Sequence, residues 1–413
     1  MEAIKNLIID LKKRDIINNI TKEDKIANLK PSDGIYIGFD PTATSLHLGN
    51  YIQIMLLKRF QKVGLKAYAL LGGATGMIGD PSFKATERLL LDAKTLEENK
   101  FAIKYQLESF GLTVIDHYDF YKDMSIIDFL RNIGKQINVN YLINKDTIAS
   151  RLETGISFTE FSYSLLQGND FLTLYNQHQI KIQAGGSDQW GNITTGLELI
   201  RKNHGETDAF GITINLLTDG NGNKFGKSVA GAIWIDEAKT SSFSLYQFLL
   251  NQPDDQVEKL LKWLTYLELD EIDKIMFYHQ QNPKQKLAQK MLALYVVQDL
   301  HGKTRANDAK EITEILFEST KPITELTEQQ FELLLKDLPV FDNQNQKRTI
   351  LDLLVSSKIC SSRREAREFL NQGAISVDGQ VKKDETEELF PRHFGFKYFI
   401  IKKGKKYFYI IKF

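Results

Sequence analysis

The sequence has very little cysteine, since Cys360 is the only one among 413 residues, and this excludes a disulfide framework or a zinc site built from cysteines. Its seven histidines are scattered and show no paired ligand spacing. No apolar run approaches the ~18 residues of a membrane-spanning helix. Residues 1–20 mix Glu2 and Asp10 with lysines, unlike a signal peptide. These absences predict a cytoplasmic globular protein.

The net charge of the chain is zero, but its basic and acidic residues are unevenly distributed along the sequence. Residues 346–413 carry fifteen Lys and Arg against eight Asp and Glu, a net +7, and the rest carries 38 against 45, a net −7. A basic tail on a mildly acidic body predicts contact with a polyanion such as nucleic acid. A solvated, lysine-rich surface would give the same count. The length and the 42% hydrophobic content leave room for two or three domains.

The central stretch is residues 36–63, in which a short apolar strand, a polar turn and a helix follow one another. The strand is expected at 35–39, and the helix, from near Gly49, stops at Gly64. The helix N-terminus points into the loop that holds Thr42 and His47, which favours a bound anion there. An ordinary loop histidine and a turn threonine fit the same stretch.

A second apolar run at 67–71 precedes a glycine-rich segment, residues 72–81. Two strands around a helix predict a parallel βαβ unit with its ligand crevice beyond the carboxyl ends of the strands. The glycine spacing does not match a dinucleotide fingerprint, so we interpret these glycines as letting the backbone approach a small ligand. Asp80 could hold an ammonium group. Lys84 and Arg88 could face a phosphate chain, although a surface turn explains them as well.

Residues 87–145 alternate helices with short apolar segments, an insertion suited to a partner or subunit contact. Beyond it, Tyr163, Gln167 and Asp170 lie at i, i+4 and i+7, so they share one helix face. Buried polar side chains need partners. This face therefore predicts either a polar small ligand or plain exposure to solvent.

Two loops after the next strands complete the candidate site. Asp188, in the loop 185–192, could accept hydrogen bonds from a ribose, or it could be a turn residue. The glycine-rich loop 218–228 carries Lys224 and Lys227, which suit a pyrophosphate. A P-loop is the alternative, but Asn221 stands where its first glycine is needed.

The last third of the chain is mainly helical before the basic tail. Periodicity predicts helices at 244–251, 256–266, 283–300 and 303–317, which either lie along RNA or pack on the first domain. Ser362 and Glu365 form a capping box that opens a basic helix, and Asp378-Gly379 forms the turn of a hairpin.

Together these segments resemble the bacterial tyrosyl-tRNA synthetases of class I. His47-Leu48-Gly49-Asn50 resembles the HIGH signature, with Asn50 in place of its last histidine. Lys224-Phe225-Gly226-Lys227-Ser228 resembles the KMSKS signature, and the loop 185–192 is similar to the corresponding loop of that family. The basic helix with its hairpin resembles an S4 RNA-binding module.

The resemblance implies a role for each candidate residue. The phosphates of ATP would be surrounded by Thr42, His47, Asn50, Lys84, Arg88, Lys224, Lys227 and Ser228. Tyrosine would be held by Tyr36, Asp80, Tyr163, Gln167, Asp170 and Gln189. The adenosine would lie against Gly38, Asp40, Gly49, Gly186 and Asp188. RNA would meet Arg363, Arg364, Arg367, Lys382 and Lys383.

The implied architecture is an α/β chain in four parts. A Rossmann-like catalytic domain with a helical insertion spans 1–235, an α-helical tRNA-contacting domain 236–318, a linker 319–345 and a small α+β S4-like domain 346–413. ATP is expected as a substrate accompanied by Mg²⁺, tRNA(Tyr) as the acceptor and a homodimer as the assembly. A tryptophanyl enzyme, a P-loop NTPase and an S4 RNA-binding protein are the alternatives.

Overall fold

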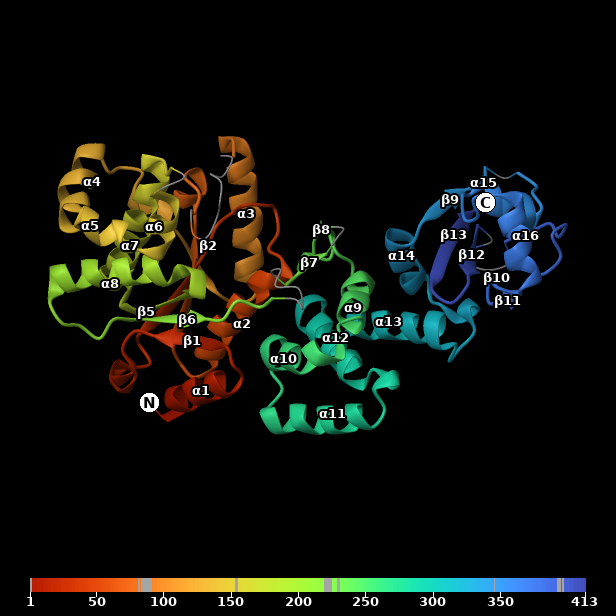
Figure 1. Cartoon of the computed structure of the whole chain (residues 1–413), viewed down its shortest axis with the longest axis horizontal. Coiled ribbons are helices and arrows are strands. Elements are labelled where there is room, and N and C mark those ends of the chain that lie inside the picture. Colours follow the sequence, from red (N-terminus) through yellow and green to blue (C-terminus); the bar gives the residue numbers. More distant parts are fainter. Residues whose placement is uncertain are drawn as a thin grey trace. The chain divides into compact units, whose positions relative to one another are not determined.

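In the computed structural model of the chain, the described residues are 2–80, 82, 91–152, 155–218, 225–228, 231–344, 346–391, 395 and 397–413. The chain divides into two compact units, which are considered one at a time (Figure 1). The first contains residues 1–235 with 262–269, and the second contains 236–261 with 270–413. Within these ranges no helix is long and apolar enough to cross a membrane.

The first unit is built on a six-stranded sheet of order β1-β6-β5-β2-β3-β4. Its strands are β1 (Ile17–Ile20), β2 (Gly34–Phe39), β3 (Lys66–Leu71), β4 (Thr113–Asp116), β5 (Ile180–Gly186) and β6 (Phe210–Ile214). All neighbours pair in parallel except β1, which pairs antiparallel with β6. Every residue of β6 is buried, as expected for a parallel strand with both faces covered.

Helices connect these strands and lie on both faces of the sheet. They are α1 (Glu2–Lys13), α2 (Leu48–Lys62), α3 (Ala93–Ser109), α4 (Ile126–Asn132), α5 (Val139–Ile143), α6 (Asp146–Leu152), α7 (Phe158–His178) and α8 (Trp190–His204). The short strands β7 (Lys227–Ser228) and β8 (Gly231–Ala232) form a separate hairpin. The predicted α/β fold with a parallel sheet and a helical insertion is confirmed, and the predicted strand, helix and strand of residues 35–71 are β2, α2 and β3.

The start of the chain contributes a strand to the sheet and apolar side chains to the core of the first unit. Residues 17–20 form β1 at the edge of the sheet, and α1 buries Ile4, Ile8 and Leu11. The four-residue strand carries two asparagines, so it gives no apolar alternation to detect. Its partner is distant in sequence, since Gly211 donates to Thr21 across 190 residues.

The second unit begins with helices and ends with a small sheet. Its helices are α9 (Ser242–Leu250), α10 (Asp254–Leu264), α11 (Leu269–Gln281), α12 (Leu287–His301), α13 (Lys303–Thr313), α14 (Glu328–Asp337), α15 (Ile350–Ser356) and α16 (Arg363–Asn371). Of these, α10 begins in the second unit and ends in the first. Helix α11 was not predicted, because its buried stripe is only Ile272, Met276 and His279.

The sheet of the second unit has the order β11-β10-β12-β13-β9. Its strands are β9 (Val340–Asp342), β10 (Ile375–Val377), β11 (Gln380–Val381), β12 (Tyr398–Lys403) and β13 (Tyr407–Lys412). The predicted hairpin is β10–β11, and Asp378 (φ 46°) and Gly379 (φ 82°) adopt the left-handed conformations that its two-residue turn needs.

The segment 319–345, predicted as a linker, contains α14 and β9. Strand β9 pairs in parallel with β13, and Phe331 of α14 shares an apolar cluster with Ile400 and Phe408. The amphipathic pattern of α14 thus buries one face against the small sheet. The division of the chain into domains at the proposed residues stays a prediction.

Candidate active site

A cleft of about 290 Å³ lies at the carboxyl ends of the parallel strands in the first unit. Twelve predicted site residues line it: Tyr36, Gly38, Asp40, Thr42, His47, Asn50, Asp80, Tyr163, Gln167, Asp170, Asp188 and Gln189. Strand β2 and the loop after it, the start of α2, the loop after β3, helix α7 and the turn after β5 supply them. Carboxyl ends of neighbouring parallel strands meet at one sheet edge, which explains why residues so far apart in sequence converge.

Other predicted residues lie off the cleft or outside the described residues. Gly49 and Gly186 are not on its wall, but a Cβ at Gly49 would come 2.9 Å from the His47 ring, and one at Gly186 would come 2.4 Å from Asp188 Oδ1. These glycines therefore make room for their polar neighbours. Lys84, Arg88 and Lys224, and the side chains of Lys227 and Ser228, are outside what the structure describes.

The start of α2 is fixed by a reciprocal cap. His47 Nδ1 accepts from the backbone N–H of Asn50 at 3.2 Å, and Asn50 Oδ1 accepts from the backbone N–H of His47 at 3.2 Å. The asparagine that departs from the signature therefore has a capping role. Since its oxygen faces the backbone, the NH₂ group is the part of the amide that can donate to a phosphate.

The hairpin β7–β8 brings the second signature beside the first. Leu48 donates to the carbonyl of Ile233 at 2.8 Å, and Ile235 donates to the carbonyl of Leu46 at 3.0 Å. A Cβ at Gly49 would lie 3.2 Å from the carbonyl oxygen of Phe225. The backbone of residues 225–228 is thus held against the N-terminus of α2.

A second set of polar contacts surrounds Asp80. Its Oδ2 accepts from Gln189 Nε2 at 2.8 Å, and its Oδ1 accepts from the backbone N–H of Ser82 at 3.0 Å. Asn192 in turn donates to Gln189 Oε1 at 3.1 Å and accepts from Ser164 at 2.8 Å. These contacts hold one carboxylate in a fixed orientation on the cleft wall.

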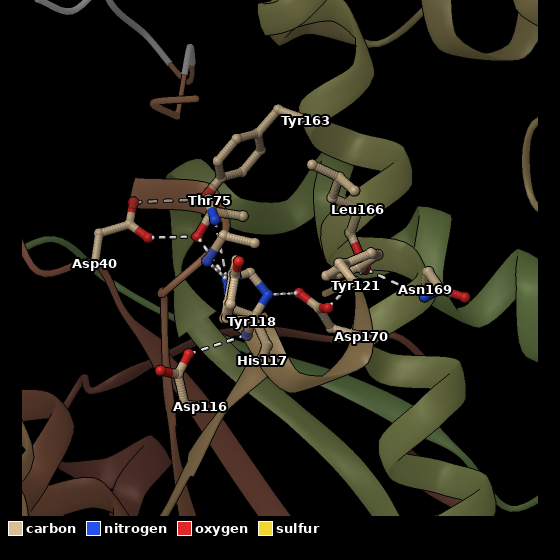
Figure 2. A network of polar contacts seen from close by, with 11 residues as sticks. Asp40, Thr75, Asp116, His117, Tyr118, Tyr121, Tyr163, Leu166, Asn169 and Asp170 are labelled. Atoms are coloured by element: carbon tan, nitrogen blue, oxygen red, sulfur yellow. Dashed lines mark hydrogen bonds and ion pairs between the residues drawn. The ribbon is translucent and has the colours of Figure 1, made fainter. Parts of the chain in front are cut away.

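The deep end of the cleft is organised around Asp170, whose side chain is only 2% exposed (Figure 2). Asp170 Oδ2 lies 2.8 Å from His117 Nδ1, and Oδ1 lies 2.8 Å from the hydroxyl of Tyr121. Asn169 donates to the same hydroxyl at 3.2 Å. Burial, together with the charge of Asp170, raises the pKa of Tyr121 well above 10, so this phenol stays protonated.

Two buried polar atoms on the cleft wall have no hydrogen-bond partner among the described residues. They are the hydroxyl of Tyr36 and Oε1 of Gln183. Burial and the nearby Asp170 also raise the pKa of Tyr36 well above 10, so its hydroxyl is a donor. An unpaired buried donor and acceptor in a cleft indicate a polar ligand that pairs with them.

The structure adds residues that sequence reasoning missed: His117, Thr75, Gln183 and Tyr121. His117 directly follows β4, and Gln183 is the polar residue within the apolar strand β5. Their positions relative to the strands could have suggested them, because ligand residues gather at strand ends.

The predicted RNA-binding cations lie in the second unit. Three of them are ion-paired: Arg363 with Asp352, Arg367 with Glu385 at 2.6 Å, and Lys382 with Glu387 at 2.6 Å. Arg364 and Lys383 are exposed. The N-cap of α16 is Ser362, as predicted, but the Glu365 carboxylate contacts the backbone N–H of Ser361 and the amine of Lys403.

Comparison with known proteins gives matches to both units. A family model for class I tRNA synthetases (W and Y) matches residues 30–318, and a model for the SYY-like C-terminal domain of tyrosine–tRNA ligase matches 330–411. The tyrosine–tRNA ligase of Ureaplasma urealyticum is 53% identical over 98% of each chain. That of Mycoplasmopsis synoviae is 49% identical over 98% of this chain and 99% of its own.

Among solved structures, a truncated mitochondrial tyrosyl-tRNA synthetase from Aspergillus nidulans superposes with a TM-score of 0.68. It is 30% identical and covers 76% of this chain and 97% of its own. A tryptophanyl-tRNA synthetase from Encephalitozoon cuniculi has a TM-score of 0.54 at 13% identity, which shows a shared fold alone.

Proposed function

We propose a role for each wall of the cleft from the premise that the chain belongs to the class I tRNA synthetases as a tyrosine–tRNA ligase. Enzymes of this kind activate L-tyrosine with ATP to tyrosyl-adenylate and pyrophosphate, and then transfer tyrosine to the 3′-terminal ribose of tRNA(Tyr). The relatives at about half identity over nearly the whole chain exclude the tryptophanyl, P-loop and purely RNA-binding alternatives.

The observation that carries the proposal is the Tyr36 hydroxyl, which has no hydrogen-bond partner among the described residues and lies near the buried Asp170. A substrate phenol would accept from Tyr36 and donate to Asp170, whose carboxylate has lone pairs beyond those used by His117 and Tyr121. Phenylalanine would leave the Tyr36 donor unpaired, at a cost of about 1–3 kcal/mol, and would make no bond to Asp170. The pair therefore selects tyrosine.

The substrate ammonium fits the wall that carries Asp80. The Asp80 carboxylate is oriented by Gln189 and by the backbone of Ser82. Tyr163 and Gln167 line the same cleft. A compact ammonium group has three donors and needs such acceptors around it. The tyrosine carboxylate would then point toward the mouth, near Gln189.

ATP fits the mouth of the cleft, where α2 begins. A Cβ at Gly38 would meet no atom within 4 Å, so this glycine leaves space against which an adenosine can lie, between Asp40 and Asp188. The phosphates would meet the N-terminus of α2 with Thr42, His47 and Asn50. Lys84, Arg88, Lys224, Lys227, Ser228 and the glycines Gly49 and Gly186 keep the roles that the resemblance implies.

The chemistry needs no covalent nucleophile from the protein. An oxygen of the tyrosine carboxylate attacks the α-phosphorus of ATP, and the bond to the departing pyrophosphate breaks, so the cleft acts by positioning and by stabilising charge. In the described part of the chain, no group of three or more His, Cys, Asp or Glu could hold a metal ion. Mg²⁺ is expected to accompany the phosphates of ATP.

The second unit and the helical insertion are suited to larger partners. Exposed cations on α16 and after β11 fit the phosphates of tRNA(Tyr). In the insertion, Ile126 and Ile127 of α4 are 74% and 67% exposed, and Leu130 and Val139 are exposed with them. Such an apolar surface supports a homodimer, which light scattering of the full chain would detect. A cytoplasmic location stays a prediction.

The test is pyrophosphate exchange into ATP without tRNA, with tyrosine, phenylalanine and tryptophan supplied separately. We expect exchange with tyrosine alone, and its loss in Asp170→Ala. Exchange with tyrosine that survives this substitution would refute the proposed reading of the phenol while leaving the family assignment intact.

A further inference from the structure

His117 is a buried, titratable side chain to which the proposed function gives no role. It is 1% exposed, although it lies on the wall of the cleft. It is the first residue after β4, and it stands between Asp170 of α7 and the loop that follows β3 (Figure 2). Its imidazole ring therefore contacts both helix α7 and the loop after β3.

The contacts determine which ring nitrogen carries the proton. His117 Nε2 lies 3.0 Å from each of the backbone nitrogens of Ala74 and Thr75, whose N–H groups donate to it. A backbone N–H can only donate, so Nε2 is the acceptor and the proton is on Nδ1. Nδ1–H therefore donates to Asp170 Oδ2 at 2.8 Å. Burial disfavours a charged ring, but the carboxylate of Asp170 raises the pKa of His117 above its usual 6.5. The two N–H groups that donate to Nε2 favour the neutral ring, in which both nitrogens are used.

Two glycines in the loop after β3 allow its backbone to approach the His117 ring. A Cβ at Gly72 would come 2.3 Å from Asp40 Oδ1, and one at Gly73 would come 2.0 Å from Asp116 Oδ1. Neither side chain can move away easily, because Asp40 accepts from Thr75 at 2.8 Å and Asp116 is ion-paired with Lys100 at 2.9 Å. Glycine at both positions thus lets the backbone approach β2 and β4 closely enough to donate to His117.

We propose that His117 is a positioning residue for amino acid selection: it fixes the orientation of the Asp170 carboxylate and ties it to the loop of residues 72–75. This rests on the proposed function, in which Asp170 accepts from the substrate phenol. Through Thr75 the same loop holds Asp40, which lies on the ATP side. Among side chains, only a ring with a donor on one edge and an acceptor on the other meets both demands in one rigid plane.

The first test compares tyrosine with phenylalanine in pyrophosphate exchange by the full-length enzyme. In His117→Ala we expect kcat/KM for tyrosine to fall roughly 10- to 100-fold, as for an unsatisfied buried group. We expect kcat/KM for phenylalanine to change little, because phenylalanine makes no bond to Asp170. The tyrosine-to-phenylalanine ratio therefore falls by about the same factor. His117→Gln, which keeps a donor and an acceptor, recovers part of the ratio.

Two controls separate positioning from loss of stability. His279 is also buried, at 2% exposure, and faces Asp254 in the second unit at 3.2 Å. We expect His279→Gln to lower stability without changing the ratio. If His117→Ala lowered both substrates equally and kept the ratio, His117 would be merely structural and the proposal would be overturned. A wild-type enzyme that did not exchange with tyrosine would instead overturn the proposed function.

A measurement on the unmodified enzyme does not depend on any variant folding. With ¹⁵N-labelled histidine, the resonance pair that is lost in His117→Gln is expected to show one protonated nitrogen, Nδ1, and one unprotonated nitrogen, Nε2, at neutral pH. A doubly protonated ring, or a proton on Nε2, would contradict the proposal, because the ring could not then accept from the loop.

Discussion

The two larger sheets of the molecule differ in how far the polar side chains beside them are buried. At the parallel sheet of the first unit, His117 and Asp170 are almost fully buried and bonded to each other. On the small, largely antiparallel sheet domain of the second unit, Arg367 and Glu385 form an ion pair with side chains that are 51% and 40% exposed. The buried pair holds the Asp170 carboxylate in one orientation. The exposed pair leaves the charges of Arg367 and Glu385 accessible at the surface.

This difference matches two kinds of recognition. A buried polar group that loses its partner costs about 1–3 kcal/mol, so a buried network can reject a small ligand that lacks one hydroxyl. An exposed ion pair contributes only about 0–1 kcal/mol, so its cation can exchange a carboxylate for a phosphate of RNA. Substitutions in the first unit should therefore have large effects on amino acid activation, and substitutions in the second should have smaller effects on RNA binding.

The largest expected effect is that of Asp80→Asn in the first unit. Removing the charge that faces the substrate ammonium should lower kcat/KM for tyrosine roughly 100-fold or more in pyrophosphate exchange. Asp119→Asn is the matched control, because Asp119 pairs with Lys122 at the surface and is 63% exposed. Equal activity of the two variants would contradict the proposed difference between a carboxylate on the cleft wall and one on the outer surface.

A smaller loss of activity, with no loss of stability, is expected from Tyr36→Phe. The substitution removes a buried hydroxyl with no partner among the described residues, so the free enzyme should melt at the same or a higher temperature. Tyrosine activation should fall about 10-fold, because the substrate phenol loses a donor. Thermal melts with and without tyrosine check both parts, and an unchanged stabilisation by tyrosine would place the phenol elsewhere.

In the second unit we expect effects on RNA alone. Arg364 and Lys383 have no ion-pair partner within the ranges that the structure describes, so they are the predicted cations best placed to meet phosphates. Replacing both with Ala should reduce the slope of log K against log salt for tRNA by about one per lost contact. Pyrophosphate exchange should be unchanged. Lys12→Ala, in α1, is the control, and an equal change of slope there would argue against a localised RNA surface.

The smallest effect is a pH dependence of the surface network around Glu365. The amine of Lys403, followed by Ser361, lowers the pKa of Glu365 from its usual 4.5 to about 2. A carboxyl group whose pKa is lower in the folded state contributes stability above about pH 4.5 and loses it as the pH falls toward 2. Glu365→Gln should therefore lose less stability than the wild type over that range, as measured by acid unfolding of the full chain. If the variant and the wild type lost stability equally as the pH fell, the contact between Glu365 and Lys403 would not contribute to stability.

The sequence predicted those parts of the fold whose signals are local. Strand β2, helix α2 and the β10–β11 hairpin follow from apolar spacing, from glycine at the helix end and from Asp378-Gly379. Strands β1 and β9 were missed, because each is at most four residues long and is defined by a partner far along the chain.

The site residues likewise could be predicted where the signal is local in the sequence, and not where it depends on distant partners. Residues in signature-like stretches, such as His47 and Asp188, could be named from the sequence and lie on the cleft. The position of His117 at a strand end could have suggested it, but its role could not be predicted, because that role depends on Asp170, 53 residues away, and on the backbone of a loop after another strand. A contact made by a backbone N–H group does not depend on the residue type, so it cannot be predicted from the sequence.

The pairing of β1 with β6 has a consequence for synthesis on the ribosome. Strand β1 leaves the exit tunnel long before β6, the strand with which it pairs, has been translated. Until then residues 17–20 have no strand to join, and the edge of the growing sheet is open to chaperones and proteases. The earliest strand is thus the last to pair, so its pairing with β6 completes the six-stranded sheet.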